Sequence, residues 1–158
     1  MDTTVLREMS DDEFTAWRER SLHDYAAERA AAHGRAYEDV LPEVERQTAG
    51  ILREGQATKG HHFFRVLEDD RPVGWLWLGP HPEKQGAAWV YDIEIDEPMR
   101  GRGIGRRAML AAEKVAAADG ASELGLNVFG ANERAIAMYQ ALGYATVAMQ
   151  MNKRLATE

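Results

Sequence analysis

Arg100-Gly101-Arg102-Gly103-Ile104-Gly105-Arg106-Arg107 is the stretch that decides how this sequence folds. It follows a predicted strand at 88–95 and leads directly into a predicted helix at 105–119. Glycines at alternate positions leave backbone N–H groups unobstructed, and a helix N-terminus adds unpaired donors at the positive end of its dipole. Four arginines lie within these eight residues of a chain whose formal net charge is -7. The stretch therefore predicts a site that holds a phosphate or pyrophosphate group.

Two common phosphate-binding motifs do not fit this stretch. A dinucleotide-binding loop needs glycine or alanine at its third conserved position, where this chain has Arg106. A Walker A loop needs Gly-Lys-Ser/Thr, which the sequence lacks. The pattern that fits is R-x-x-G-x-G, formed by Arg100, Gly103 and Gly105.

The residues downstream complete a longer pattern. A predicted strand at 123–128 is followed by Asn132, Ala135, Tyr139 and the segment Leu142-Gly143-Tyr144. Together with the arginine–glycine motif, this order of strand, Asn, helix, Tyr and Gly-aromatic resembles the acyl-CoA signature of the GNAT superfamily of N-acetyltransferases. The resemblance is tight from Trp89 to Tyr144 and loose before Trp89.

The GNAT resemblance implies a fold and a co-substrate. The expected fold is a single α/β domain over residues 1–158, with a mixed sheet whose two central parallel strands splay apart, flanked by helices. Acetyl-CoA is the implied co-substrate, and its pantetheine arm is expected in the opening, against the strand backbone of Ile93 and Ile95. The residues expected to meet the rest of acetyl-CoA are Arg100, Gly101, Arg102, Gly103, Ile104, Gly105 and Arg106 in the loop, and Asn132 and Tyr139 on the last helix.

Periodicity and turn signals predict the order strand, two helices, three strands, helix, strand, helix, strand. Ser10 and Glu13 form a capping box that opens the first helix. Residues 69–72 read as the turn of a hairpin, and the helix between strands 88–95 and 123–128 makes those strands a parallel pair. The predicted elements are 5–9, 10–32, 37–54, 61–68, 73–79, 88–95, 105–119, 123–128, 132–142 and 145–153.

Acetyl transfer to an amine requires a base, donors to the oxyanion and an acid for the thiolate, because an ordinary amine of pKa ~10 is protonated at neutral pH. By resemblance, Tyr139 is the candidate acid; the alternative is that it packs on the sheet with its hydroxyl at the rim. Asn132 is expected to cap the last helix, and by resemblance also to bind the pantetheine arm. Backbone N–H groups near Ile95 are the candidate oxyanion donors.

Asp92 and Glu94 are the candidate bases. Their spacing puts both side chains on one face of the strand, opposite Tyr91, Ile93 and Ile95, unless a bulge re-aims one of them. Asp92 is favoured because it aligns with an acidic position that some GNAT amine acetyltransferases use. Three alternatives stay open: a solvent-facing carboxylate, a carboxylate paired with an arginine, and a water relay to a backbone carbonyl.

Four further side chains have open roles. Arg102 or Arg107 either reaches the 3′-phosphate of the adenosine or is solvated surface. Trp17 and Tyr25 on the first helix either line an acceptor site, by resemblance, or simply pack an amphipathic helix.

Composition limits the remaining classes of function. A 45% hydrophobic and 28% charged chain with no cysteine is typical of a cytoplasmic globular protein, and no apolar run is long enough to span a membrane. The 26 acidic against 19 basic residues disfavour nucleic-acid binding, including tRNA acetylation. The histidine spacings match no metal template, so no metal is expected.

The resemblance implies transfer of acetyl from acetyl-CoA to a primary amine by direct attack in a ternary complex. The chain has no cysteine that could carry a covalent thiol intermediate. The expected partner is a small-molecule or peptide amine, and a homodimer is an open expectation. Two alternatives are an N-terminal acetyltransferase of peptides or proteins and an acyl-CoA-binding regulatory module without catalysis.

Overall fold

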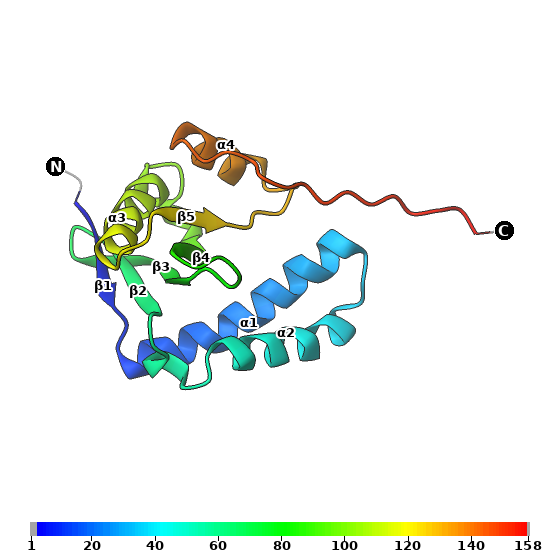
Figure 1. The fold of residues 1–158 in the computed structure, drawn as a ribbon, viewed down its shortest axis with the longest axis horizontal. Coiled ribbons are helices and arrows are strands. Elements are labelled where there is room, and N and C mark those ends of the chain that lie inside the picture. Colours follow the sequence, from blue (N-terminus) through cyan, green and yellow to red (C-terminus); the bar gives the residue numbers. More distant parts are fainter. Residues whose placement is uncertain (1–2, 158) are drawn as a thin grey trace.

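The computed structural model describes residues 3–157, and its elements follow the predicted order up to the last helix (Figure 1). Among these residues, no helix combines the length and the apolar character needed to cross a membrane. The strands are β1 (Thr4–Glu8), β2 (His62–Glu68), β3 (Arg71–Pro80), β4 (Ala87–Ile95) and β5 (Glu123–Leu126). The helices are α1 (Asp11–His33), α2 (Tyr37–Ile51), α3 (Ile104–Ala118) and α4 (Glu133–Ala141), with 3-10 turns at Gly55–Ala57 and Glu97–Met99.

The five strands form one mixed sheet in the order β1-β2-β3-β4-β5. The first three pairings are antiparallel and the β4–β5 pairing is parallel, which confirms the predicted α/β mixed sheet. Asp69 and Asp70 turn the β2–β3 hairpin with φ angles of 49° and 65°. Two consecutive positive φ values match the twist of the flanking strands in a two-residue hairpin, which explains why short polar residues occupy this turn.

The parallel strands β4 and β5 splay apart as expected. Pairing begins at Ala87 with Glu123 and ends at Val90 with Leu126, while β4 continues to Ile95 against β3 alone. The second half of β4 therefore presents its backbone on the side that β5 has left. This opening lies next to the N-terminus of α3, because the loop that follows β4 leads into that helix.

A bulge interrupts β4 at Tyr91. In the ladder with β3, Trp77 pairs with Asp92 and Leu78 pairs with Val90, so Tyr91 is the extra residue. Its ring stacks on Trp77 with centroids 4.4 Å apart, and Trp77 lies 5.6 Å from Trp17 of α1. The prediction that Tyr91 lies opposite Asp92 was therefore wrong, because the bulge turns two consecutive side chains toward α1.

The helices cover the two faces of the sheet. Helix α1 opens with the predicted capping box, in which Glu13 N–H donates to Ser10 Oγ at 3.2 Å and Ser10 N–H donates to Glu13 Oε1 at 3.0 Å. Phe14 and Trp17 pack α1 against Phe63 and Trp77 of the sheet. Helix α3 packs on the other face through buried residues on one side of the helix: Ile104, Ala108, Met109, Ala112 and Ala116.

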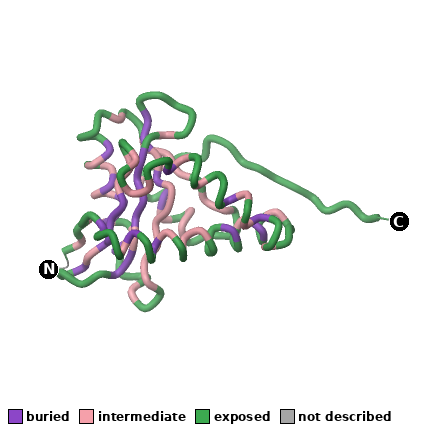
Figure 2. The backbone as a smooth tube through the Cα atoms, turned by 90° about the horizontal axis from the view of Figure 1, so that it is seen from below, coloured by how far each residue is buried: buried purple, intermediate pink, exposed green. Residues whose placement is uncertain are grey.

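The strand predicted at 145–153 was wrong. After Tyr144 the described chain contains no strand, and residues 145–157 run as an extended segment away from the body (Figure 1). Figure 2 shows this segment exposed along its whole described length. Alternating apolar residues favour a strand, but a strand also needs a neighbour to accept its backbone hydrogen bonds, and within one described chain none lies beside this segment.

Candidate active site

The loop between β4 and α3 offers free backbone donors at a helix N-terminus. Gly101 and Gly103 have φ angles of 79° and 78°, which only glycine adopts without strain, and Gly103 is the N-cap of α3. The first intrahelical bond runs from Arg107 N–H to Gly103 C=O at 3.1 Å, so the N–H groups of residues 104–106 have no intrahelical acceptor. Neither a capping side chain nor an acidic residue occupies this first turn. The geometry therefore suits an anion.

Gly105 lets α3 approach its neighbours closely. A Cβ at this position would lie 3.3 Å from Met138 Sδ of α4 and 3.7 Å from Ile95 Cγ1 at the end of β4. The glycine thus brings together the loop, the open half of β4 and the helix that carries Tyr139. The motif residues Gly103 and Gly105 have different physical reasons for being glycine: backbone conformation at the first and close packing at the second.

The loop arginines differ in their surroundings. The Arg107 guanidinium donates to Thr4 Oγ1 at 2.8 Å and to Glu68 Oε1 at 3.0 Å, so it joins α3 to β1 and β2. Arg100 Nε donates to the Ile95 carbonyl at 2.7 Å. Arg106 is exposed beside the free N–H groups.

Arg134, which the sequence analysis missed, lies against the loop. Its Nη2 is so near Gly101 that a Cβ there would come within 2.8 Å of it. The signal that could have found it is its place in the first turn of α4, just after Asn132. Asn132 itself caps α4, because its Oδ1 accepts from Ala135 N–H at 3.3 Å, as expected.

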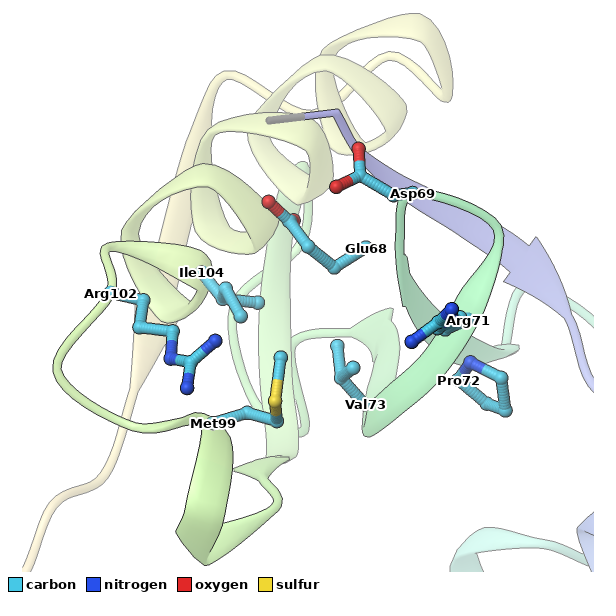
Figure 3. A pocket seen from close by; sticks show the side chains of 8 residues that line it. All are labelled: Glu68, Asp69, Arg71, Pro72, Val73, Met99, Arg102 and Ile104. Atoms are coloured by element: carbon cyan, nitrogen blue, oxygen red, sulfur yellow. The ribbon is translucent and has the colours of Figure 1, made fainter. Parts of the chain in front are cut away.

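A cavity of about 640 Å³ lies beside the loop, on the side of the β2–β3 hairpin. Figure 3 shows Arg102 and Arg71 reaching into it from opposite walls, with Glu68 and Asp69 above them. Among the predicted site residues, only Arg102 and Ile104 line it. The cavity is therefore separate from the side chains proposed for acid–base chemistry.

Asp92 is held against α1 by two donors to one oxygen. Trp17 Nε1 and Ser21 Oγ donate to Asp92 Oδ2 at 3.1 Å and 3.2 Å. Among the described residues, Oδ1 accepts no hydrogen bond. Burial raises the pKa of Asp92 to about 6, and the negative charges of Glu94 and Glu28 add to this, against the lowering effect of the two hydrogen bonds.

Glu94 is in a different environment from Asp92. It forms an ion pair with Arg20 of α1, with Oε1 2.9 Å from Nη2, and Arg100 Nη2 lies 3.9 Å from the same oxygen. Sequence reasoning left open the alternative that a carboxylate of this strand pairs with an arginine, and Glu94 is the residue that does so.

Tyr139 is buried on α4, with 8% of its surface exposed. Burial raises the pKa of its hydroxyl to about 12, and the nearby negative charge of Asp92 adds to that rise. Since the Asp92 charge affects Tyr139, the two side chains face the same region, between the open half of β4 and α4. At neutral pH this hydroxyl keeps its proton and Asp92 is mostly ionised.

Helix α1 brings several polar and aromatic side chains to the same region. Trp17 and Ser21 hold Asp92, and Tyr25 lies 6.2 Å, between ring centroids, from Phe129 in the loop after β5. Glu28 has its pKa raised by burial, then by the charges of Asp24 and Glu94. Ser21 and Glu28 were missed by the sequence analysis, although their spacings of four and eleven residues from Trp17 place them on the same face of the helix and could have found them.

The comparisons with known proteins agree with this geometry. The Acetyltransferase (GNAT) family model matches residues 6–144, and the chain therefore belongs to the GNAT family of N-acetyltransferases, which use acetyl-CoA as acyl donor. The N-acetyltransferases YdgE and YycN of Bacillus subtilis are 30% and 31% identical over 96% and 97% of this chain, and the matches span 98% and 99% of their own lengths.

Two solved structures place the fold among enzymes. The crystal structure of YycN from Bacillus subtilis matches with a TM-score of 0.89 at 30% identity, covering 98% of this chain and 100% of that one. The aminoglycoside N-acetyltransferase AAC(6')-Iy, solved in complex with CoA, matches with a TM-score of 0.58, covering 99% and 97% of the two chains. At 16% identity that second likeness concerns the fold alone.

Proposed function

We propose that this protein transfers acetyl from acetyl-CoA to the primary amine of a small cationic acceptor, by direct attack in a ternary complex. The observation that carries the proposal is that Asp92 of β4 and Tyr139 of α4 are both desolvated by burial and are close enough for the charge of Asp92 to raise the pKa of Tyr139. Asp92 is a carboxylate with a raised pKa and one oxygen that accepts no hydrogen bond from the described residues. Tyr139 is a buried neutral phenol whose pKa is raised further by the charge of Asp92. Opposite proton-transfer roles require such a pair.

The donor half of the site is assigned to the glycine loop. Its free N–H groups at residues 104–106 and the exposed Arg106 suit the pyrophosphate of acetyl-CoA. Arg134 adds a second cation from α4. The unpaired backbone of β4 at Ile93 and Ile95 suits the amide groups of the pantetheine arm, as a peptide strand would.

Asp92 is proposed as the base. Its Oδ1 accepts a proton from the ammonium group of the acceptor, while Trp17 and Ser21 keep Oδ2 in place. The raised pKa makes the carboxylate a better proton acceptor than an ordinary aspartate, while leaving it ionised at neutral pH. Glu94 is proposed to hold Arg20 and to contribute negative charge, without taking the proton itself.

Tyr139 is proposed as the acid. The amine lone pair attacks the thioester carbonyl carbon, and the oxyanion that forms is stabilised by backbone N–H groups near Ile95. The C–S bond then breaks, the thiolate takes the Tyr139 proton, and the second proton that the acetylated nitrogen must lose returns to the Tyr139 oxygen. Burial keeps this proton on the phenol until the thiolate forms, because a neutral phenol is cheaper to desolvate than a phenolate.

The acceptor is proposed to be cationic because the wall opposite the sheet is acidic. Glu28 of α1 lies close enough to Asp24 of the same helix and to Glu94 of β4 for their charges to raise its pKa. The charges of Glu94 and Glu28 in turn raise the pKa of Asp92. Neighbouring carboxylates repel one another when they are ionised, and a bound cation stabilises their ionised form. A diamine or polyamine can place a second ammonium group among these carboxylates.

The test is CoA-thiol release from acetyl-CoA with a panel of diamines, polyamines, aminoglycosides, amino acids and N-terminal peptides. The acceptor of the mycothiol acetyltransferases joins the panel, because relatives of that name, such as the Gordonia bronchialis protein, are 34% identical over 88 residues, 56% of this chain and 28% of theirs. With no cysteine in the chain, a thiol reagent detects only product. Turnover confined to peptides would overturn the small-acceptor proposal, and no turnover with intact acetyl-CoA binding would overturn catalysis.

Tyr139→Phe is expected to lower kcat ten-fold or more while leaving the Kd of acetyl-CoA within about two-fold, because only the proton donor is removed. Tyr144→Phe is the matched control, since its hydroxyl donates to Glu113 and not toward Asp92. Steady-state kinetics and calorimetric acetyl-CoA binding measure the two quantities. An unchanged kcat would remove Tyr139 from the acid role.

A further inference from the structure

The segment after α4, residues 145–157, has apolar side chains with nothing to cover them. Val147, Met149 and Met151 are 95%, 73% and 83% exposed, and Leu155 is 75% exposed. Val147, Met149 and Met151 fall on alternate positions, and Leu155 follows four residues later with Lys153 between. In an extended chain all four apolar side chains therefore lie on one face. Within the described chain, no hydrogen bond or ion pair joins this segment to the body of the protein. Such a face is typical of a strand whose partner is missing.

Among the described residues, the outer edge of β5 lacks a neighbouring strand, as the segment after α4 does. In the described sheet β5 pairs with β4 alone, so its other edge presents unpaired backbone N–H and C=O groups. None of the residues of β5 is fully buried. Helix α4, which follows β5, buries only Tyr139, although Ala135, Met138 and Leu142 all face the main core. This corner of the molecule lacks a layer of apolar cover.

The segment does not cover the β5 edge of its own chain. Arg154 lies against the turn between α1 and α2, where a Cβ on Gly34 would come within 3.0 Å of its Nη2. Figure 1 shows the segment passing beyond the end of α1 and away from β5. In a two-fold dimer, the uncovered segment of each copy can pair with the open β5 edge of the other copy, so that both segments and both edges gain a partner.

We propose that residues 145–157 add as a strand to the open edge of β5 in a second copy of this chain, and that the exchange is reciprocal about a two-fold axis. Backbone hydrogen bonds would join the two strands, and Val147, Met149 and Met151 would cover the half-buried apolar side chains of β5 and α4. The β1 edge fits less well, because Thr4 there is engaged by the charged side chains of Glu68 and Arg107.

The exchange bears on the active site, a consequence that rests on the proposed function. Tyr139 sits on the short helix α4, whose position is set by few buried contacts of its own chain. A strand from the partner against β5 and α4 would hold that helix, and with it the proposed acid, in place.

Sedimentation equilibrium of the full chain gives the first test, because mass does not depend on catalysis. The proposal expects the mass of two chains at micromolar concentration. The mass of a single chain over the whole accessible concentration range would overturn it.

Cross-linking identifies the geometry, since the cysteine-free chain accepts engineered thiols without background. Asn127→Cys, just after β5, is combined with Gln150→Cys in the segment, and a short bis-maleimide is added. Covalent dimers on a denaturing gel are expected; internally linked monomers would show that the segment folds back on its own β5 and would overturn the exchange. Val5→Cys with Gln150→Cys is the control on the β1 edge, and equal dimer yield from it would also overturn the β5 assignment.

A charge in the segment supplies a test without chemical modification. Met149→Lys is expected to raise the dimer dissociation constant at least about ten-fold, because it brings an unpaired ammonium group against apolar surface. Gln150→Lys places the same charge on the other face and is expected to leave the constant within about three-fold. Because residue 149 is exposed in a single copy, folding of the isolated chain is unaffected, and equal effects of the two variants would overturn the strand model.

Discussion

Asp92 is a residue whose acid–base behaviour is changed strongly by its surroundings. It lies at the bulge of β4, where two consecutive side chains turn toward α1, and its Oδ2 is occupied by donors from that helix. Desolvation outweighs those hydrogen bonds, so the pKa rises to about 6. The carboxylate proposed as the base is thereby more basic than an ordinary aspartate.

Asp92→Asn is expected to separate activity from stability. Loss of the base should lower kcat/KM at least about 100-fold, while the amide oxygen can still accept from Trp17 and Ser21. Because folding raises the pKa of Asp92 from 3.8 to about 6, the wild-type fold loses stability from this group as pH rises through that window. At about 1.4 kcal/mol per unit the loss is at most on the order of 3 kcal/mol.

Urea unfolding of both proteins at pH 5 and pH 8 measures that difference. The wild type is expected to lose more free energy of unfolding between the two pH values than Asp92→Asn does. Equal changes in the two proteins, or full activity of the variant, would contradict the assignment of Asp92.

Gly103→Asp is expected to abolish measurable acetyl-CoA binding, because it strains a position with φ of 78° and brings a negative charge to the helix N-terminus. Gly103→Asn is the matched variant: asparagine has the same size, tolerates positive φ better than most residues and carries no charge. Asparagine should weaken the Kd far less than aspartate does. Equal weakening in calorimetric titrations would mean that backbone strain, not phosphate charge, explains the glycine.

Among the elements, the site lies where β4 extends beyond the end of its pairing with β5. The parallel pairing ends at Val90 and Leu126, and β4 continues with its backbone open toward the N-terminus of α3 and toward α4. Helix α3 is fastened at its first turn by Arg107, which reaches Thr4 of β1 and the buried Glu68 of β2. The first turn of α3 is therefore tied to the far edge of the sheet.

Arg107→Met is expected to destabilise the fold by about 2 kcal/mol, because Glu68 keeps its charge at a buried position without its partner. The KM for acetyl-CoA should stay within about two-fold. Arg106→Met is the crossed control, with unchanged stability and a several-fold higher KM, since Arg106 is exposed at the free N–H groups. Thermal unfolding and initial rates distinguish the two; a raised KM in the Arg107 variant would give that residue a phosphate role.

Across the whole molecule, charge is divided between an acidic body and a basic loop. The net charge is -7 although four arginines lie within residues 100–107. Such a distribution attracts a cationic acceptor and an anionic donor to different places.

Salt is therefore expected to affect acceptors according to their charge. Raising NaCl from 50 to 500 mM should lower kcat/KM several-fold for a diamine and distinctly less for a monoamine of similar length, because screening removes a longer-range attraction from the dication. Measurements at saturating acetyl-CoA report kcat/KM for the acceptor alone. The same dependence of kcat/KM on salt for the two amines would show that the acidic body does not attract the acceptor electrostatically.

The features that the sequence predicted correctly are those set by residues close together in the chain. The capping box of α1, the turn at Asp69 and Asp70, the N-cap Asn132 and the glycine loop depend on neighbouring residues, and all lie where they were expected. The fold class followed because a parallel pair joined by a helix allows few topologies.

The errors concern contacts between residues far apart in the chain. Tyr91 lies on the unexpected face because a bulge depends on the register with β3. Arg134 and Ser21 reach the site only through the packing of α4 and α1, which no local pattern encodes. Residues 145–153 have the alternation of a strand, yet pairing also needs a strand edge beside them, and in the described chain the segment runs away from the open edge of β5 (Figure 1).

The hold that α1 has on Asp92 bears on any attempt to redesign this protein. Trp17 and Ser21 belong to the same helix as Tyr25, which contacts Phe129, and Glu28, which is close to the charge of Glu94. Libraries that vary this helix to accommodate a new amine will shift the pH optimum along with the selectivity. Selections run at a single pH would therefore discard variants whose pocket is right but whose proton acceptor has been retuned.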